Sequence, residues 1–333
     1  MKVSRRLAVV VALVIAFGAP AAAYLKLGTR VGGRTVPLEW RQFPIRYFIT
    51  NRDVDGVTAQ QLSTAVQRAF LTWQAVPNTQ TTSNLVGFTQ ASPTSGDGAT
   101  VLGFQNRPEL DRTLAATNFS IDSTTGEIVE SDIFFNSAFT WSTSDAGVSG
   151  RFDVESIALH EIGHLFGLSH SALGETELQS GGGRKVLGAE AVMFPIAFSA
   201  GDISDRRLKA DDVAGFSDIY GNQTFQRQTG SVSGRVTKNG QGVLGAHVVA
   251  FNPASGKLVG GFTLSDDGAF VIAGLEPGPQ VLRAEPLDDG DVSSFFDATM
   301  DIDTEFRVKF YEKVVIVPKG GGTRDIEIKV LPK

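Results

Sequence analysis

The sequence predicts an α+β unit followed by an all-β unit, and three observations lead to this prediction. First, residues 44–136 hold short runs that alternate like strands, with turn-rich stretches between them. Second, three segments carry apolar residues at helical spacing, and they begin near Thr58, at Asp153 and near Ala210. Third, the chain beyond residue 230 contains only strand-like runs and turns. We therefore expect a twisted mixed sheet with three main helices, and then a β-sandwich.

The individual elements follow from local signals. Strands of the first unit are expected at residues 44–50, 85–89, 99–104, 114–121 and 127–136. Thr58 and Gln61 make a capping-box pattern ahead of the first long helix. The third helix has Asp211 and Asp212 in its first turn, where they complement the helix dipole, and Gly221 lies just past its end.

The N-terminus reads as a secretory signal peptide over residues 1–23. Basic residues precede an apolar run at 7–17, and small residues at 21–23 mark a cleavage site after Ala23. The apolar run is too short for a bilayer span, which needs about 20 residues. We therefore expect an exported protein, secreted or periplasmic, with no membrane span after removal of the signal.

Composition excludes several classes of partner and site. The formal net charge is −6 and no basic run is present, so nucleic acid is not an expected partner. The chain has no cysteine, so neither disulfides nor cysteine-ligated zinc can support the fold. Core packing must hold the exported chain together, with help from any bound metal.

The stretch HEIGHLFGLSH at residues 160–170 holds three of the four histidines. His160 and His164 are four residues apart, so a helix places both on one face, close enough to share a metal ion. Gly167 can adopt a left-handed conformation that ends the helix and turns the chain. His170 would then return to the metal as a third ligand.

This pattern points to catalytic zinc chemistry. Three neutral imidazoles with one open position suit Zn²⁺, and Glu161 lies where a carboxylate can take a proton from activated water. A chance meeting of structural histidines and a closed structural zinc site are the alternatives. The scarcity of histidine disfavours the first, and Glu161 has no use in the second.

The motif and its context resemble the matrixins, a family of metzincin zinc proteases. The resemblance rests on HEIGHLFGLSHS, then VMFP, then LKADDVAGFSDIYG, and it runs from about Trp40 to Gly221. It implies one catalytic Zn²⁺ and an extended polypeptide substrate bound near 114–121. By position, the implied roles are zinc ligands for His160, His164 and His170, general base for Glu161, hydrophobic floor for Met193, and pocket wall for Pro195 and Ile196.

The sequence also departs from that family. Many animal matrixins hold a second zinc through further histidines, but here only His247 remains, far along the chain. Their latency uses a propeptide cysteine, which this chain lacks. The spacing from His170 to Met193 is long, so residues 174–185 are expected to be an inserted mobile loop beside the cleft. Calcium is compatible with the loop aspartates, although no spacing assigns its ligands.

Beyond a linker at 222–230, residues 231–333 resemble a carboxypeptidase-regulatory-like domain, an Ig-like or transthyretin-like sandwich. We expect a matrixin-like domain at 24–221 to do the chemistry without help from this module. Two other functions stay open: a secreted binding or adhesion protein whose sandwich is the working part and whose metal site is vestigial, and a zinc hydrolase that cleaves a non-protein bond. Natural substrate, cleavage preference and oligomeric state are not specified by the sequence.

Overall fold

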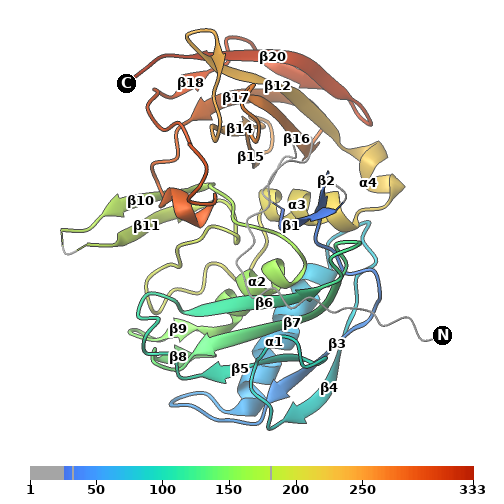
Figure 1. Ribbon diagram of the computed structural model, residues 1–333. Coiled ribbons are helices and arrows are strands. Elements are labelled where there is room, and N and C mark those ends of the chain that lie inside the picture. The colour runs from blue at the N-terminus through green and yellow to red at the C-terminus, as the bar shows by residue number, and fades with distance from the viewer. Residues whose placement is uncertain (1–25, 32–33, 181) are drawn as a thin grey trace.

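The computed structural model describes residues 26–31, 34–180 and 182–333 (Figure 1). The predicted signal peptide, 1–23, lies outside these residues. Within the described part, no helix is long and apolar enough to cross a membrane. In Figure 1 a mixed sheet with helices lies below, and the strands of the C-terminal part lie above it.

The N-terminal part is built on one five-stranded sheet with the order β4-β3-β5-β7-β6. All neighbouring pairs are parallel except β6 and β7, which are antiparallel. The strands are β3 (Ile45–Thr50), β4 (Ser83–Thr89), β5 (Thr100–Gln105), β6 (Ala115–Ile121) and β7 (Ile128–Asn136). Each corresponds to a predicted strand, and β6 lies at the edge of the sheet.

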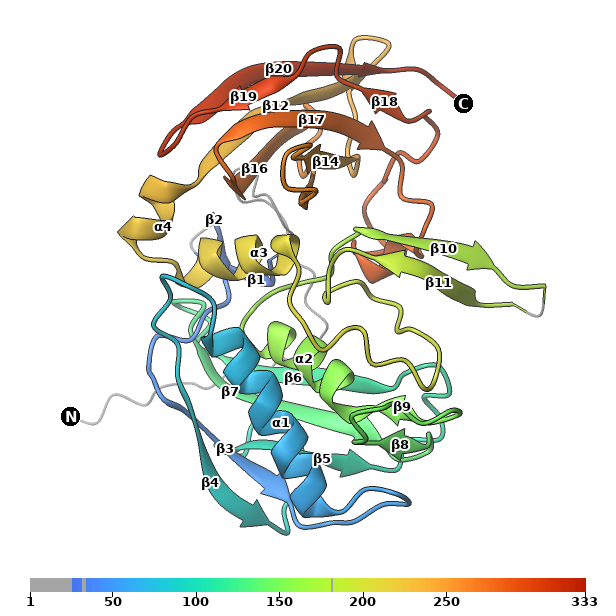
Figure 2. The same ribbon diagram turned by 180° about the vertical axis from the view of Figure 1, so that it is seen from behind.

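The N-terminal part also contains short strand pairs. One is an antiparallel hairpin of β1 (Gly28–Val31) with β2 (Arg34–Pro37), and another is a parallel pair of β8 (Trp141–Ser142) with β9 (Phe152–Asp153). Another hairpin, β10 (Gly174–Leu178) with β11 (Arg184–Ala189), projects from the body of the molecule (Figure 2). The expectation of a loop is therefore wrong for residues 174–178 and 184–185, which pair in an antiparallel ladder.

Two helices cover one face of the sheet (Figure 2). They are α1 (Ala59–Gln74) and α2 (Val154–Leu165). The predicted capping box is present, since Gln61 N donates to Thr58 Oγ1 at 3.2 Å and Thr58 N donates to Gln61 Oε1 at 2.9 Å. It satisfies main-chain donors that a helix start leaves free.

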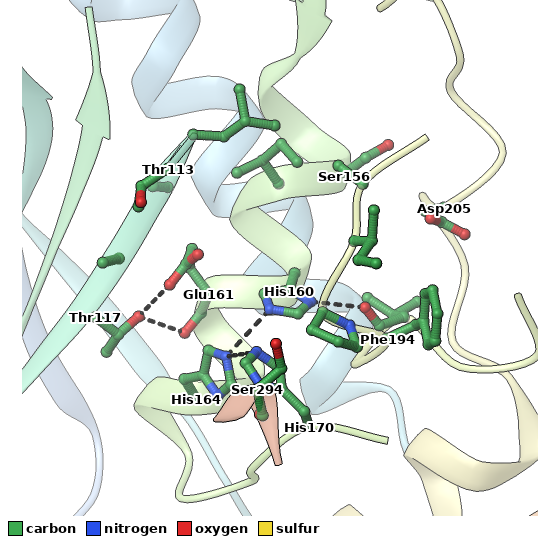
Figure 3. Close-up of a pocket in the computed structure, with 18 of the residues that line it drawn as sticks. Thr113, Thr117, Ser156, His160, Glu161, His164, His170, Phe194, Asp205 and Ser294 are labelled. Atoms are coloured by element: carbon green, nitrogen blue, oxygen red, sulfur yellow. Dashed lines mark hydrogen bonds between the residues drawn. The ribbon is translucent and has the colours of Figure 1, made fainter. Parts of the chain in front are cut away.

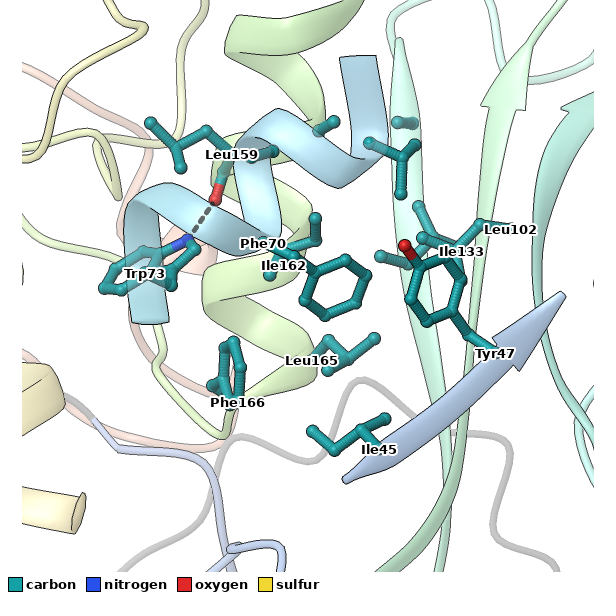
Figure 4. Packing of buried hydrophobic residues seen from close by; sticks show 14 of the residues in the cluster. Ile45, Tyr47, Phe70, Trp73, Leu102, Ile133, Leu159, Ile162, Leu165 and Phe166 are labelled. Carbon is teal, nitrogen blue, oxygen red and sulfur yellow. Dashed lines mark hydrogen bonds between the residues drawn. The ribbon is translucent and has the colours of Figure 1, made fainter. Parts of the chain in front are cut away.

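The apolar stripe of α1 meets α2 in the largest core of the described chain (Figure 4). Phe70 stacks on Tyr47 of the sheet with ring centroids 4.6 Å apart. The indole nitrogen of Trp73 donates to the Leu159 carbonyl at 2.8 Å, so a buried polar group is satisfied within α2. This packing fixes α2 against the sheet.

The C-terminal part contains two sheets around a shared apolar cluster. One has the order β13-β12-β16 with β20 beside β12; the other has the order β15-β14-β17-β18 with β19 beside β17. The bounds are β12 (Gly230–Lys238), β13 (Gln241–Gly242), β14 (His247–Phe251), β15 (Leu258–Phe262), β16 (Ala269–Leu275), β17 (Gly278–Glu285), β18 (Lys309–Phe310), β19 (Val315–Val317) and β20 (Gly322–Val330). Membership of the carboxypeptidase-regulatory-like family stays a prediction.

The expected linker is largely ordered and the two parts are in contact. Helix α3 (Ala210–Tyr220) is followed at once by the short helix α4 (Gln223–Gln228), and β12 begins at Gly230. The buried carboxylate of Asp211 in α3 accepts a hydrogen bond from Gly260 N of β15 at 2.8 Å. Residues 222–230 are thus a structured connection rather than a free tether.

Candidate metal centre

The histidine cluster begins on α2 and ends in the turn after it. Asp153 caps the helix by accepting from Ser156 N at 2.9 Å. At the other end Gly167 has φ +94°, and the bonds Gly167 N to His164 O and Leu168 N to Gly163 O form a Schellman turn. The left-handed glycine predicted from sequence is therefore confirmed, and it brings His170 back beside the helix.

The three imidazoles converge at one point (Figure 3). His164 Nε2 lies 3.1 Å from His160 Nε2 and 3.2 Å from His170 Nε2. Two imidazole nitrogens that share a tetrahedral zinc are about 3.3 Å apart, given Zn–N bonds of about 2.0–2.1 Å. Among the described residues, this trio is the one group of three or more His, Cys, Asp or Glu whose ligand atoms all lie within 4.8 Å of one another.

Main-chain carbonyls fix the tautomer of each ring. His160 Nδ1 lies 2.8 Å from Val192 O, and His164 Nδ1 lies 2.8 Å from Leu168 O. His170 Nδ1 lies 2.6 Å from Ser294 O. A carbonyl can only accept, so each Nδ1 carries the proton and each Nε2 presents a lone pair. Three lone pairs that face one another repel, and a cation between them removes that repulsion.

Burial keeps the three rings neutral. It is the largest cause that lowers the pKa of His160 to about 3, and neighbouring His170 acts in the same direction. Burial also lowers the pKa of His164 and His170, with His160 and His170 adding to the effect at His164. Neutral imidazole is the form that binds a metal ion.

Glu161 lies beside the cluster and is buried, with 5% of its surface exposed. Thr117 Oγ1 of edge strand β6 lies 2.7 Å from Glu161 Oε2 and 3.0 Å from Glu161 O. Burial raises the pKa of Glu161 to about 7, and the Thr117 hydroxyl opposes this shift. The carboxylate is thus held at a defined place between α2 and β6.

Met193 packs against α2 at Gly163. A Cβ atom added to Gly163 would come within 2.3 Å of Met193 Sδ, so the bare glycine lets the thioether reach the helix. Val192 and Met193 form a turn, called the methionine turn below. Asp212 holds it by accepting from Val192 N at 2.9 Å and Met193 N at 3.1 Å. The same turn supplies the Val192 carbonyl to His160, so Met193 and the first histidine share one support.

A cleft of about 770 Å³ opens beside the cluster. Strand β6 lines it at Ala115–Thr117, and the predicted wall residues Pro195 and Ile196 also face it. Asp291 and Ser294 of the C-terminal part contribute to the lining as well. The structure thus brings all seven predicted site residues to one region.

Sequence reasoning missed three contributors to this site. Thr117 lay in a predicted strand, but nothing marked its hydroxyl as a partner of Glu161. The sequence indicates only that Asp212 complements the helix dipole, whereas its carboxylate also accepts from Val192 N and Met193 N. Ser294 acts through its main-chain carbonyl, so no side-chain signal reveals it.

The fold and site define a protein that can hold a metal ion at the floor of an open cleft. Residues 39–180 match the family model Matrixin. Stromelysin-1 of Mus musculus is 27% identical over 193 residues, which cover 56% of this chain and 34% of that protein. Metalloendoproteinase 5-MMP of Arabidopsis thaliana is 36% identical over 88 residues, covering 24% of this chain and 20% of that protein.

The chain is thus similar to the matrixin family over residues 39–180, in line with the resemblance of the sequence motif. The chain spans about a third of the length of Stromelysin-1 and less of the plant relative. Among solved structures, the Bacillus anthracis TIE protein is 20% identical with a TM-score of 0.20, covering 32% of this chain and 17% of that one. So low a score carries no argument about the fold.

Gly167→Ala is expected to destabilise the fold more than alanine at another left-handed glycine. Its new Cβ would lie 2.2 Å from Leu38 O, in addition to the strain of a positive φ. Gly240→Ala is the matched control, since Gly240 has φ +83° and nothing within 4 Å. We expect the control to cost about 1–2 kcal/mol and Gly167→Ala to cost clearly more in chemical unfolding. Equal losses would show that the approach to Leu38 is not tight.

Proposed function

We propose that this protein is an exported zinc-dependent endopeptidase with His160, His164 and His170 as ligands. The observation that carries the proposal is the convergence of three Nε2 lone pairs, each fixed by a carbonyl on its Nδ1, at the floor of the cleft. Zinc in such a site supplies Lewis acidity, which polarises a carbonyl group and acidifies water.

The chain's own residues supply the remaining chemistry in this proposal. Glu161 takes a proton from the attacking water and passes it to the leaving amine. Thr117 orients the carboxylate through its bond to Oε2, which leaves Oε1 for the water. Met193, packed against Gly163, keeps the helix that bears two ligands and the base at a fixed height above the turn.

The substrate is proposed to bind as an extended strand along β6. This strand ends the sheet, so its outer main-chain groups have no strand partner within the five-stranded order. An extended peptide can add to such an edge through main-chain hydrogen bonds. Ala115–Thr117 line the cleft, so a peptide paired there would pass in front of the histidines.

Metal analysis should find one zinc per chain, and chelation should abolish peptidase activity. The reason is that the described residues contain one three-residue cluster of suitable ligand atoms. Readdition of zinc should restore activity, which controls for damage by the chelator. Two tightly held zinc ions would contradict the single-site proposal, and the absence of bound zinc would overturn the function.

Glu161→Gln should retain zinc and fold but lower turnover by about 10²-fold or more, the scale of general acid–base catalysis. The amide keeps the shape of the side chain and can still accept from Thr117. Glu190→Gln serves as control, because Glu190 is exposed and does not line the cleft. A near-normal rate in Glu161→Gln with zinc still bound would show that another group is the base.

Ile196→Ala should change the side-chain preference of cleavage in a peptide library, because Ile196 lines the cleft. Leu187→Ala is the matched control, since Leu187 is an exposed apolar residue of β11 outside the cleft lining. The comparison is made on the ratio of kcat/KM values among peptides. An unchanged preference in Ile196→Ala would refute the assignment of this residue to the pocket wall.

A further inference from the structure

A segment of the C-terminal part reaches the metal centre. It runs from Asp288 to Phe296 and includes the 3₁₀ turn η1 (Val292–Ser294). Figure 1 shows it as an orange-red loop that descends from the upper strands to the base of the β10–β11 hairpin. In Figure 3 Ser294 lies beside His170.

The contact between them is a hydrogen bond from the His170 side chain to the main-chain carbonyl of Ser294, 124 positions further along the sequence. His170 Nδ1 lies 2.6 Å from Ser294 O, closer than the corresponding carbonyl contacts of the other two histidines. The ring of Phe295 also meets the His170 ring edge-on, with centroids 6.4 Å apart.

His170 needs such support more than its two partners do. His160 and His164 lie on α2, where helix geometry and core packing fix their backbones. His170 lies in the loop after the helix, so its ring orientation depends on what its side chain contacts. An outer partner of this kind sets the tautomer and direction of a ligating histidine.

Apolar packing anchors the segment. Phe295 and Phe296 are each 1% exposed and pack with Phe262 and Leu287 in a separate apolar cluster. Phe262 belongs to β15, so the cluster ties the segment to the C-terminal sheets. The main chain of the 3₁₀ turn closes with Phe295 N donating to Val292 O at 3.0 Å.

Polar contacts tie the segment to the hairpin. Thr176 N donates to Asp289 Oδ1 at 2.6 Å, and Arg184 donates to Asp288 O at 2.8 Å. The β10–β11 hairpin therefore braces the segment from the side of the N-terminal part.

We infer that residues 288–296 are a positioning segment for the third metal ligand, so that the metal centre is complete only with the C-terminal part in place. The inference rests on the proposed function in so far as His160, His164 and His170 bind zinc. It differs from the expectation that the module at 231–333 gives no help to the chemistry, because Ser294 O lies 2.6 Å from His170 Nδ1. A chain that ends near Gln228 lacks this carbonyl.

The test compares two buried phenylalanines of the C-terminal part in the full-length protein. Phe295 packs at His170, whereas Phe270 of β16 lies in the main C-terminal core and has the same 1% exposure. Zinc affinity is measured by competition with a chromophoric chelator. We expect Phe295→Ala to weaken zinc binding roughly 10–100-fold, the usual scale for partners of ligating residues, and Phe270→Ala to leave it within about 3-fold.

A second readout separates positioning from general destabilisation. With Co²⁺ in place of zinc, the visible absorption reports ligand geometry, so Phe295→Ala should alter the band and Phe270→Ala should not. Asp289→Ala provides a milder variant that loosens the segment without a core cavity, with exposed Asp301 replaced by alanine as its control. We expect Asp289→Ala alone of this pair to weaken zinc binding.

The outcomes are distinct. Equal zinc affinity and an unchanged cobalt spectrum in Phe295→Ala and Asp289→Ala would overturn the inference while leaving the proposed function intact. Equal weakening by Phe270→Ala would overturn it too, since the effect would then be one of overall stability. Failure of the wild-type protein to bind zinc would instead overturn the proposed function itself.

Discussion

Three hydrogen bonds, one from each imidazole Nδ1 to a main-chain carbonyl, determine whether this site can hold a metal ion. They place the protons on the outer nitrogens and turn three lone pairs inward. The carbonyls belong to Leu168, Val192 and Ser294, which lie in three different segments. All three segments must therefore be in place at once, and much of the remaining structure serves that requirement.

Each segment has its own support. Leu168 is placed by the Schellman turn at Gly167. This turn follows α2, which the hydrogen bond from Trp73 to the Leu159 carbonyl helps to fix. Val192 is held by the carboxylate of Asp212 at the start of α3. Tyr220 at the end of α3 donates to Phe166 O at 2.8 Å, so one helix braces both the methionine turn and the end of α2.

Much of this was predictable because it is written in local patterns. The histidine spacing, the glycine hinge, the capping box at Thr58 and the strands of the first sheet all follow from side-chain type and period. The hairpin at 174–189 was not predictable in this way. Its glycine-rich, polar sequence reads as a loop, and contacts with Asp288 and Asp289, more than a hundred residues away, help to hold it.

Strand β15 and the Ser294 contact carry little signal in the sequence, for related reasons. The run LVGGF contains two adjacent glycines, which weaken a strand signal. In the structure Gly260 N donates to Asp211. Gly260 also leaves room for His247, whose Nε2 would lie 2.5 Å from an added Cβ. A main-chain carbonyl exists at every residue, so the one that orients His170 carries no mark in the sequence. Such contacts depend on tertiary placement alone.

The contact between His170 and Ser294 couples metal binding to the docking of the C-terminal part, which the sequence presents as separate events. If the C-terminal part improves the affinity of the site for zinc by orienting a ligand, zinc must stabilise the docked C-terminal part by the same factor. The chain has no cysteine, so no disulfide can hold the two parts together. Non-covalent contacts do this, among them the buried bond from Gly260 N to Asp211 and the aromatic packing around Phe295. Bound zinc would add a further tie at the same interface, so metal loading and the integrity of the whole molecule would reinforce each other.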